Sequence, residues 1–174
     1  MKRCLVTLIL AILLVPVSAL AAGPSSSAVV HVSWTVLPFQ SLTIDGSVAG
    51  TNTSITNRYD VRKPDASDFA AGFIEDDGVL VLNAASNIPW AVKVHSIESD
   101  MGTSYNGSYI KPLSDFMVRV NGGSFFSIST SDQVLASGTR GAYLLSVDYK
   151  VKVNEGTYKD GDYGLTLVYT ITGK

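Results

Sequence analysis

The chain has almost no cysteine. Its single cysteine, Cys4, lies in an N-terminal segment that we expect to be removed during export, so the mature protein has none. Disulfide bonds and cysteine-based metal or redox sites are therefore excluded from the mature domain. A domain of 152 residues, the length of residues 23–174, buries about 68 to 70% of its unfolded surface, which is enough for a stable core without such cross-links.

Histidine, the usual general base of enzymes, is also scarce. The chain has only His31 and His95, each on the side of a predicted strand opposite its apolar row. It has no Gly-x-Ser-x-Gly nucleophile motif and no His/Cys cluster with metal-site spacing. We therefore expect no enzymatic activity, no catalytic residue and no cofactor. A triad assembled from residues distant in sequence, or a carboxylate pair in a cleft, are the alternatives that stay open.

The first 22 residues have the pattern of a secretory signal peptide. An apolar stretch at residues 5–17 follows two basic residues and precedes the small-x-small sequence at residues 19–21. The apolar stretch is shorter than the roughly 20 residues that span a bilayer. We expect cleavage after Ala21 or Ala22, export to the cell surface or beyond, and one domain over residues 23–174 without a transmembrane segment.

Positive charge is in short supply once that segment is gone. Removal of Lys2 and Arg3 leaves 11 of the 13 basic residues against 15 acidic ones, a net charge of about −4. Binding of nucleic acid calls for a basic face. Nucleic acid is therefore not an expected partner.

Two segments near the C-terminus alternate between apolar and polar residues, as half-buried strands do. They cover residues 142–153 and 163–172, with the turn-rich residues 154–162 between them. This arrangement predicts a β-hairpin. The apolar faces are those of Tyr143, Leu145, Val147, Tyr149, Val151 and Val153 in the first strand, and Leu165, Leu167, Tyr169 and Ile171 in the second.

Shorter alternating segments and turns fill the middle of the chain. The Asp-Asp-Gly sequence at residues 76–78 predicts a hairpin turn, and a strand beginning at Trp90 follows the turn at residues 86–89. A turn of helix is predicted within residues 62–71, but no stretch of ten or more residues has a helical apolar period. We therefore predict an all-β fold, an immunoglobulin-like β-sandwich of about eight to ten mostly antiparallel strands.

An alternating segment also follows the predicted cleavage site. Residues 28–37 place apolar side chains on one side and polar ones on the other, up to Pro38, which has no N–H for a sheet ladder. We predict a first strand here and place Trp34, like Trp90, in a hydrophobic core. The apolar side chains are those of Val30, Val32, Trp34 and Val36.

The end of the chain resembles the C-terminal motif of chaperone–usher pilins and of related secreted fibre subunits of the spore-coat-U type. Counted back from the last residue as one, Ile171, Tyr169 and Leu167 stand at positions four, six and eight, and Gly161 stands at fourteen. Residues 28–36 are similar to the alternating segment that follows the signal peptide in these proteins.

The resemblance implies an incomplete immunoglobulin-like fold that a strand from a neighbouring subunit completes. It also implies self-association into polymers and a periplasmic chaperone as partner. The chain departs from the pilin pattern at Gly173, where those proteins usually carry an aromatic residue, and in having no disulfide.

These features predict a non-enzymatic, exported structural subunit of a cell-surface fibre, assembled by β-strand addition. The residues expected to carry the assembly are Val30, Val32, Trp34 and Val36 in the donated strand, and Leu167, Tyr169 and Ile171 in the core that it meets. The alternative is a strand that pairs within its own subunit. The protein would then be a secreted carbohydrate- or protein-binding module, with Tyr105 and Tyr109 as candidate contacts.

Two loops rich in carboxylates offer oxygen ligands of the kind that calcium prefers. Glu75, Asp76 and Asp77 lie in one loop, and Asp160 and Asp162 in the other. Neither loop has the twelve-residue EF-hand pattern, and Asp-Gly sequences are common in turns without a metal. We favour the turn and predict no metal site.

Overall fold

The computed structural model describes residues 30–44, 58–153 and 158–174. They belong to two compact units, Met1–Thr35 and Val36–Lys174, each of which is described by itself. The second unit holds all the helices and strands of the described residues. The predicted signal peptide lies outside the described residues. No helix in the described part of the chain has the length and apolar character needed to cross a membrane.

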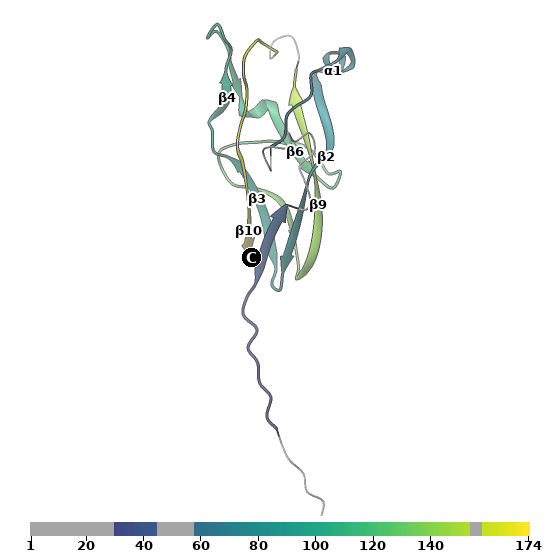
Figure 1. Ribbon diagram of the computed structural model, residues 1–174, viewed down its shortest axis with the longest axis vertical. Helices are drawn as coiled ribbons and strands as arrows, with labels where there is room; N and C mark the ends of the chain where they lie inside the picture. Colours follow the sequence, from purple (N-terminus) through teal and green to yellow (C-terminus); the bar gives the residue numbers. More distant parts are fainter. Residues whose placement is uncertain (1–29, 45–57, 154–157) are drawn as a thin grey trace, which may run out of the picture. The chain divides into compact units, whose positions relative to one another are not determined.

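The second unit is built almost entirely of strands (Figure 1). In chain order the elements are β1 (Gln40–Ile44), α1 (Ala66–Ala71), β2 (Phe73–Ser86), β3 (Trp90–Ser96), β4 (Asp100–Thr103), β5 (Ile110–Pro112), the 3-10 turn η1 (Leu113–Asp115), β6 (Phe116–Val120), β7 (Phe126–Ser127), β8 (Gln133–Gly138), β9 (Gly141–Lys152) and β10 (Leu167–Gly173). One sheet has the order β1-β2-β9-β6-β7, a second has the order β10-β3-β8, and β4 pairs with β5. All these pairings are antiparallel. The predicted all-β, mostly antiparallel fold is confirmed.

The two larger sheets pack together around one apolar core, as the sheets of a β-sandwich do. Trp90, Val92 and Val94 of β3 meet Leu145 and Val147 of β9 in this core, and none of the five is more than 4% exposed. Full burial of one such side chain stabilises the fold by about 1.5–3 kcal/mol. The apolar face predicted for residues 142–153 is the face of β9 that lies against this core.

Trp90 occupies the core position that the sequence predicts for it. Its indole packs against the backbone of Gly138 so closely that a Cβ atom at position 138 would lie 2.7 Å from Trp90 Cζ2. Trp90 pairs with Gly138 across β3 and β8. Glycine is therefore required at position 138 because the indole takes the space of a side chain.

The segment predicted as the first strand, residues 28–37, forms no strand in the part that the structure describes, residues 30–37. The first strand, β1, begins only at Gln40, after Pro38. Trp34 is 79% exposed, and the side chains of Val30, Val32 and Val36 are exposed as well. The prediction that Trp34 lies in a core is therefore wrong for the single chain. Alternation shows that one face is suited to burial, but it does not say which surface covers that face.

The predicted C-terminal hairpin is wrong in its pairing, although both strands exist. β9 pairs with β2 and β6 in one sheet, whereas β10 pairs with β3 in the other. The connection between them crosses from one sheet to the other. The apolar faces of both strands then meet inside the sandwich, where Tyr149 and Tyr169 contact each other.

The predicted hairpin turn at residues 76–78 is a bulge inside one long strand, β2. Both halves of β2 pair with β9, and the register shifts between Asp76 and Leu80. Gly78 has a φ of +61°, and its N–H donates to Asp148 Oδ1 at 2.7 Å. The contact with Asp148 of the neighbouring strand keeps the chain in the sheet, where a local turn would have reversed it.

The predicted helical turn is present as α1. The Asp65 side chain accepts hydrogen bonds from the N–H groups of Ser67 and Asp68. In turn, the Asp68 carboxylate accepts a hydrogen bond from the Asp65 N–H. This reciprocal capping satisfies N–H groups that a short helix leaves open. Gly72, with a φ of 80°, ends the helix.

Candidate functional site: an open cleft between two edge strands

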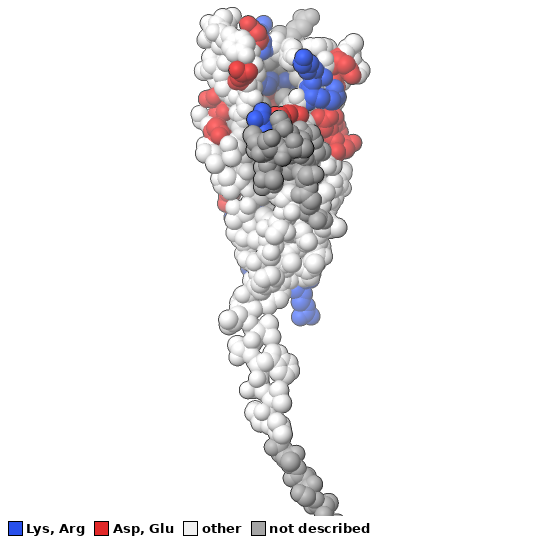
Figure 2. Space-filling view, in the orientation of Figure 1, with Lys and Arg blue, Asp and Glu red and all other residues white. Residues whose placement is uncertain are grey.

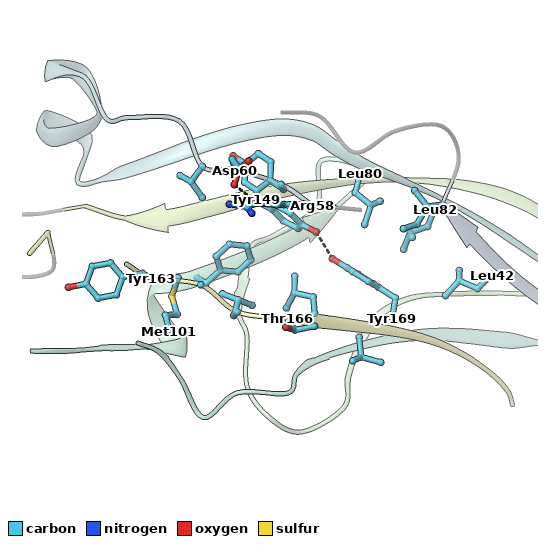
Figure 3. Close-up of a pocket in the computed structure, with 18 of the residues that line it drawn as sticks. Leu42, Arg58, Asp60, Leu80, Leu82, Met101, Tyr149, Tyr163, Thr166 and Tyr169 are labelled. Atoms are coloured by element: carbon cyan, nitrogen blue, oxygen red, sulfur yellow. Dashed lines mark hydrogen bonds and ion pairs between the residues drawn. The ribbon is translucent and has the colours of Figure 1, made fainter. Parts of the chain in front are cut away.

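A cleft of about 840 Å³ lies between β1 and β10, which are edge strands of different sheets (Figure 3). Its lining is mainly apolar and aromatic. Leu42 comes from β1, and Leu80 and Leu82 come from β2. The remaining apolar and aromatic side chains are those of Ile44, Tyr59, Val61, Met101, Phe116, Tyr149, Tyr163, Leu165, Leu167, Val168 and Tyr169. Such a lining suits a partner that brings several apolar side chains.

The backbone of β10 leaves hydrogen-bonding groups directed toward this cleft. Gly164 N donates to Met101 O at 2.8 Å, Ile97 N donates to Thr166 O at 3.1 Å, and Lys174 N donates to Pro89 O at 3.0 Å. The even-numbered residues thus pair on the β3 side of the strand. Successive peptide groups of a strand point to opposite sides, so the odd-numbered residues 165–171 direct theirs to the other edge.

That edge has no strand partner among the described residues. β10 pairs with β3 alone and β1 with β2 alone. An unpaired row of N–H and C=O groups is a template for an added strand. The cleft therefore offers both elements of β-augmentation, an apolar floor and a free strand edge.

Two phenols form a polar contact inside the cleft. The hydroxyls of Tyr149 in β9 and Tyr169 in β10 are 2.9 Å apart, and Figure 3 shows the two side chains pointing toward each other. Burial raises the pKa of Tyr149 to about 12. Burial, with the neighbouring Tyr149, also holds the pKa of Tyr169 well above its usual range. Both phenols are therefore neutral at physiological pH, and their hydrogen bond links the two sheets.

Glu98 holds the chain just before β10 against the β3 side. Its carboxylate accepts hydrogen bonds from Thr166 N at 2.6 Å and from Thr166 Oγ1 at 2.8 Å. The bond from the Thr166 N–H is the main cause that lowers the pKa of Glu98. The contact fixes Thr166 from one side and leaves the cleft side of the strand open.

The chain is similar to a solved chain of a chaperone–usher pilus. The two share 15% sequence identity, and the match covers 87% of this chain and 98% of the other with a TM-score of 0.40. That structure concerns the molecular basis of rod uncoiling. No family model and no curated protein matches the chain.

The structure brings together the predicted assembly residues of the last strand. Leu167 and Tyr169 line the cleft, and Ile171 packs against the core further along β10. The roles of Val30, Val32, Trp34 and Val36 in assembly stay a prediction. Sequence reasoning missed the cleft residues Leu42, Leu80, Met101, Tyr149 and Tyr163, because their place on the cleft follows from the pairing of distant strands.

Gly173 closes the packing at the end of β10. A Cβ atom there would lie 3.0 Å from Ile88 Cδ1 and 3.2 Å from Gln40 Nε2. Both are end atoms of flexible side chains, so a side chain at position 173 would require Ile88 and Gln40 to shift by a few tenths of an ångström.

The carboxylates around the β2 bulge take part in ion pairs. Glu75 contacts Arg119 at 3.0 Å and Lys150 at 2.8 Å, and Asp77 contacts Arg119 at 2.7 Å. Asp76 pairs with Arg62 at 3.2 Å. Figure 2 shows charged side chains gathered toward the end of the domain that carries α1 and β4, while the opposite end is largely uncharged on this face.

The described residues contain no group of three or more His, Cys, Asp or Glu side chains placed to hold a metal ion. The carboxylates of residues 75–77 form ion pairs with arginine and lysine side chains. Their negative charge is therefore balanced by these basic side chains without a bound metal ion. The ion pairs at the bulge thus link β2 to β6 and β9.

Proposed function

We propose that the protein is a non-enzymatic, exported structural subunit of a cell-surface fibre that assembles by β-strand addition. In this assembly the N-terminal segment of one copy, with Val30, Val32, Trp34 and Val36, occupies the cleft of another copy. The observation that carries the proposal is the apolar cleft between two edge strands, β1 and β10, which have no strand partner on the cleft side among the described residues. A strand laid there would cover the cleft and pair with the free edge of β10.

The segment and the cleft match in length and period. Residues 30–36 and the cleft-lining residues 163–169 each span about 20 Å at roughly 3.3 Å per residue. Four apolar side chains at alternate positions in the segment match four side chains at alternate positions of the cleft lining, those of Tyr163, Leu165, Leu167 and Tyr169. This match supports insertion as a regular strand.

The positions of the strand ends favour an open-ended polymer. Gln40 at the start of β1 pairs with Ser86, and Gly173 at the end of β10 pairs with Trp90. The chain therefore enters the sandwich at the end marked by the β2–β3 turn (Figure 1). Donation from that end to the cleft of a like-oriented copy is a head-to-tail contact, which generates a filament when it does not close into a ring.

A periplasmic chaperone is the second partner in this proposal. An apolar cleft with a free strand edge is an aggregation hazard until it is filled. A chaperone that covers β10 before assembly would remove this hazard. Export by the predicted signal peptide would deliver the subunit to such a chaperone and then to the cell surface.

The test compares the size distribution of the mature protein with that of the double variant Val32→Lys/Val36→Lys. We expect SDS-resistant polymers from the unchanged protein and none from the variant, because two ammonium groups cannot be buried unpaired in the cleft. The matched control is Ser33→Lys/Thr35→Lys, which places the same charges on the opposite side of the segment. Equal polymer formation by both double variants would contradict the proposal.

A secreted binding module is the second candidate function, because Tyr105 in the β4–β5 loop is 69% exposed. Tyr109 is less exposed than Tyr105, and its hydroxyl donates to Asp115 Oδ2 at 3.3 Å. Loss of glycan or protein binding in Tyr105→Ala, in a monomer that keeps its fold, would favour this function. A monomeric protein that binds nothing on a glycan array would count against it.

A further inference from the structure

Asn87, in the turn between β2 and β3, clamps the chain just before β1. Phe39 N donates to Asn87 Oδ1 at 2.7 Å, and Asn87 Nδ2 donates to Leu37 O at 2.8 Å. Asn87 N also donates to Phe39 O at 3.2 Å. One residue thus supplies the donors and the acceptor that a neighbouring strand would supply to Leu37 and Phe39.

The clamped segment is held in an extended course by its own sequence as well. Leu37 precedes Pro38 and is therefore restricted to extended conformations. Pro38 has no N–H to donate, and Asn87 bonds the backbone of its two neighbours, Leu37 and Phe39. The side chains of Leu37 and Phe39 are 73% and 56% exposed, so hydrogen bonds rather than side-chain burial fix this stretch.

The course of this stretch decides which cleft the N-terminal segment can reach. To fill the cleft of its own domain, the segment would have to reverse at residues 37–39 and run antiparallel to β1 as a hairpin. Such a reversal changes the backbone at Leu37 and Phe39 and breaks the bonds to Asn87. To fill the cleft of another copy, the segment only has to continue away from β1.

We propose that Asn87 is a positioning residue that directs the N-terminal segment to another copy and disfavours insertion into its own cleft. This inference rests on the proposed assembly by strand addition, which it extends with a device that selects the acceptor. The contacts lie wholly within Val36–Lys174, so the clamp is a property of the domain itself.

The test uses the mature chain with Val32→Cys and Leu167→Cys and a short bis-maleimide cross-linker. The mature chain has no other cysteine, so a cross-link within one chain gives a monomer and a link between chains gives a ladder. The two are separated on a denaturing gel. The same cysteine pair is placed in Asn87→Ala, in Asn87→Asp and in the control Asn83→Ala, which changes an asparagine within β2.

We expect ladders from the parent and from Asn83→Ala. Asn87→Ala should raise the ratio of intrachain to interchain product roughly five- to thirtyfold, the effect of losing two ordinary hydrogen bonds. Asn87→Asp keeps the acceptor for Phe39 N–H and loses the donor to Leu37 O, so its ratio should lie between those of the parent and Asn87→Ala.

An unchanged ratio in Asn87→Ala would overturn the inference while leaving strand donation intact. Loss of ladders in Asn87→Ala without a gain of intrachain product would also overturn it, because Asn87 would then only stabilise the fold. Absence of both products from the parent would contradict the proposed function and, with it, this inference.

Discussion

β9 and β10 have the same alternating pattern but differ in their number of neighbours. β9 pairs with β2 on one side and β6 on the other, whereas β10 pairs with β3 alone among the described strands. Leu145 and Val147 of β9 are buried, while Leu167 and Tyr169 of β10 are only partly buried. The comparison teaches that alternation reports which face of a strand is apolar and does not report whether both edges are paired.

The largest expected effect is in β9, where both edges and one face are closed. Val147→Lys places an unpaired ammonium at a position that is 0% exposed, at a cost above about 4–5 kcal/mol. We expect the variant to fail to fold, as measured by circular dichroism and urea denaturation. Leu144→Lys, three residues earlier at a side chain that is 61% exposed, is the control and should fold. Similar urea midpoints for both variants would contradict the assigned core face.

A synthetic peptide can take the place of the strand that β10 lacks on its cleft side among the described residues. A peptide of residues 28–37, added in excess to the full-length variant Val32→Lys/Val36→Lys, should raise its melting temperature by about 5–10 °C. The gain arises because a ligand of the folded state alone stabilises that state. A peptide with the same two lysines is the control, and an equal shift with both peptides would show that the apolar face of the segment is not what binds.

A smaller effect is expected at the hydrogen bond between Tyr149 of β9 and Tyr169 of β10. Tyr169→Phe leaves the Tyr149 hydroxyl without its partner and should lower the free energy of unfolding by about 1–3 kcal/mol. Tyr149→Phe/Tyr169→Phe removes both hydroxyls and should cost less than the sum of the two single changes. Chemical denaturation of the three variants measures this coupling. Strict additivity would mean that the hydrogen bond contributes nothing.

The smallest effect concerns pH. The folded pKa of Glu98 is lowered, so its contribution to stability is present above the unfolded value and is lost as pH falls through the folded value. Between pH 7 and pH 3 the melting temperature of the unchanged protein should therefore fall further than that of Glu98→Gln. Parallel decreases in both proteins would show that Glu98 does not stabilise the start of the last strand.

Local sequence patterns predicted the elements that form largely independently of which distant strands they pack against. The helical turn within residues 62–71 follows from local residue preferences, and the strand beginning at Trp90 and the apolar face of β9 follow from the period of two. The sequence also placed Leu167 and Tyr169 together on one apolar face, and both lie in the cleft.

Features that depend on distant contacts were not predictable in this way. Residues 76–78 form a bulge because Asp148 accepts from Gly78 N–H across the sheet. Trp34 and Trp90 stand in similar alternating segments, yet only Trp90 has a facing sheet in the single chain. The approach of Tyr149 to Tyr169 required β9 and β10 to belong to different sheets, which local alternation does not specify.

The edge of β10 that faces the cleft, which no described strand pairs with, has a numerical consequence for any polymer built by strand addition. Each copy brings one cleft and one segment, so a linear row of any length keeps one empty cleft at one end and one free segment at the other. The two ends are chemically different, and the row has a polarity from its first contact onward. A molecule that carries only a segment, or only a cleft, would stop growth at one end and leave the other end active.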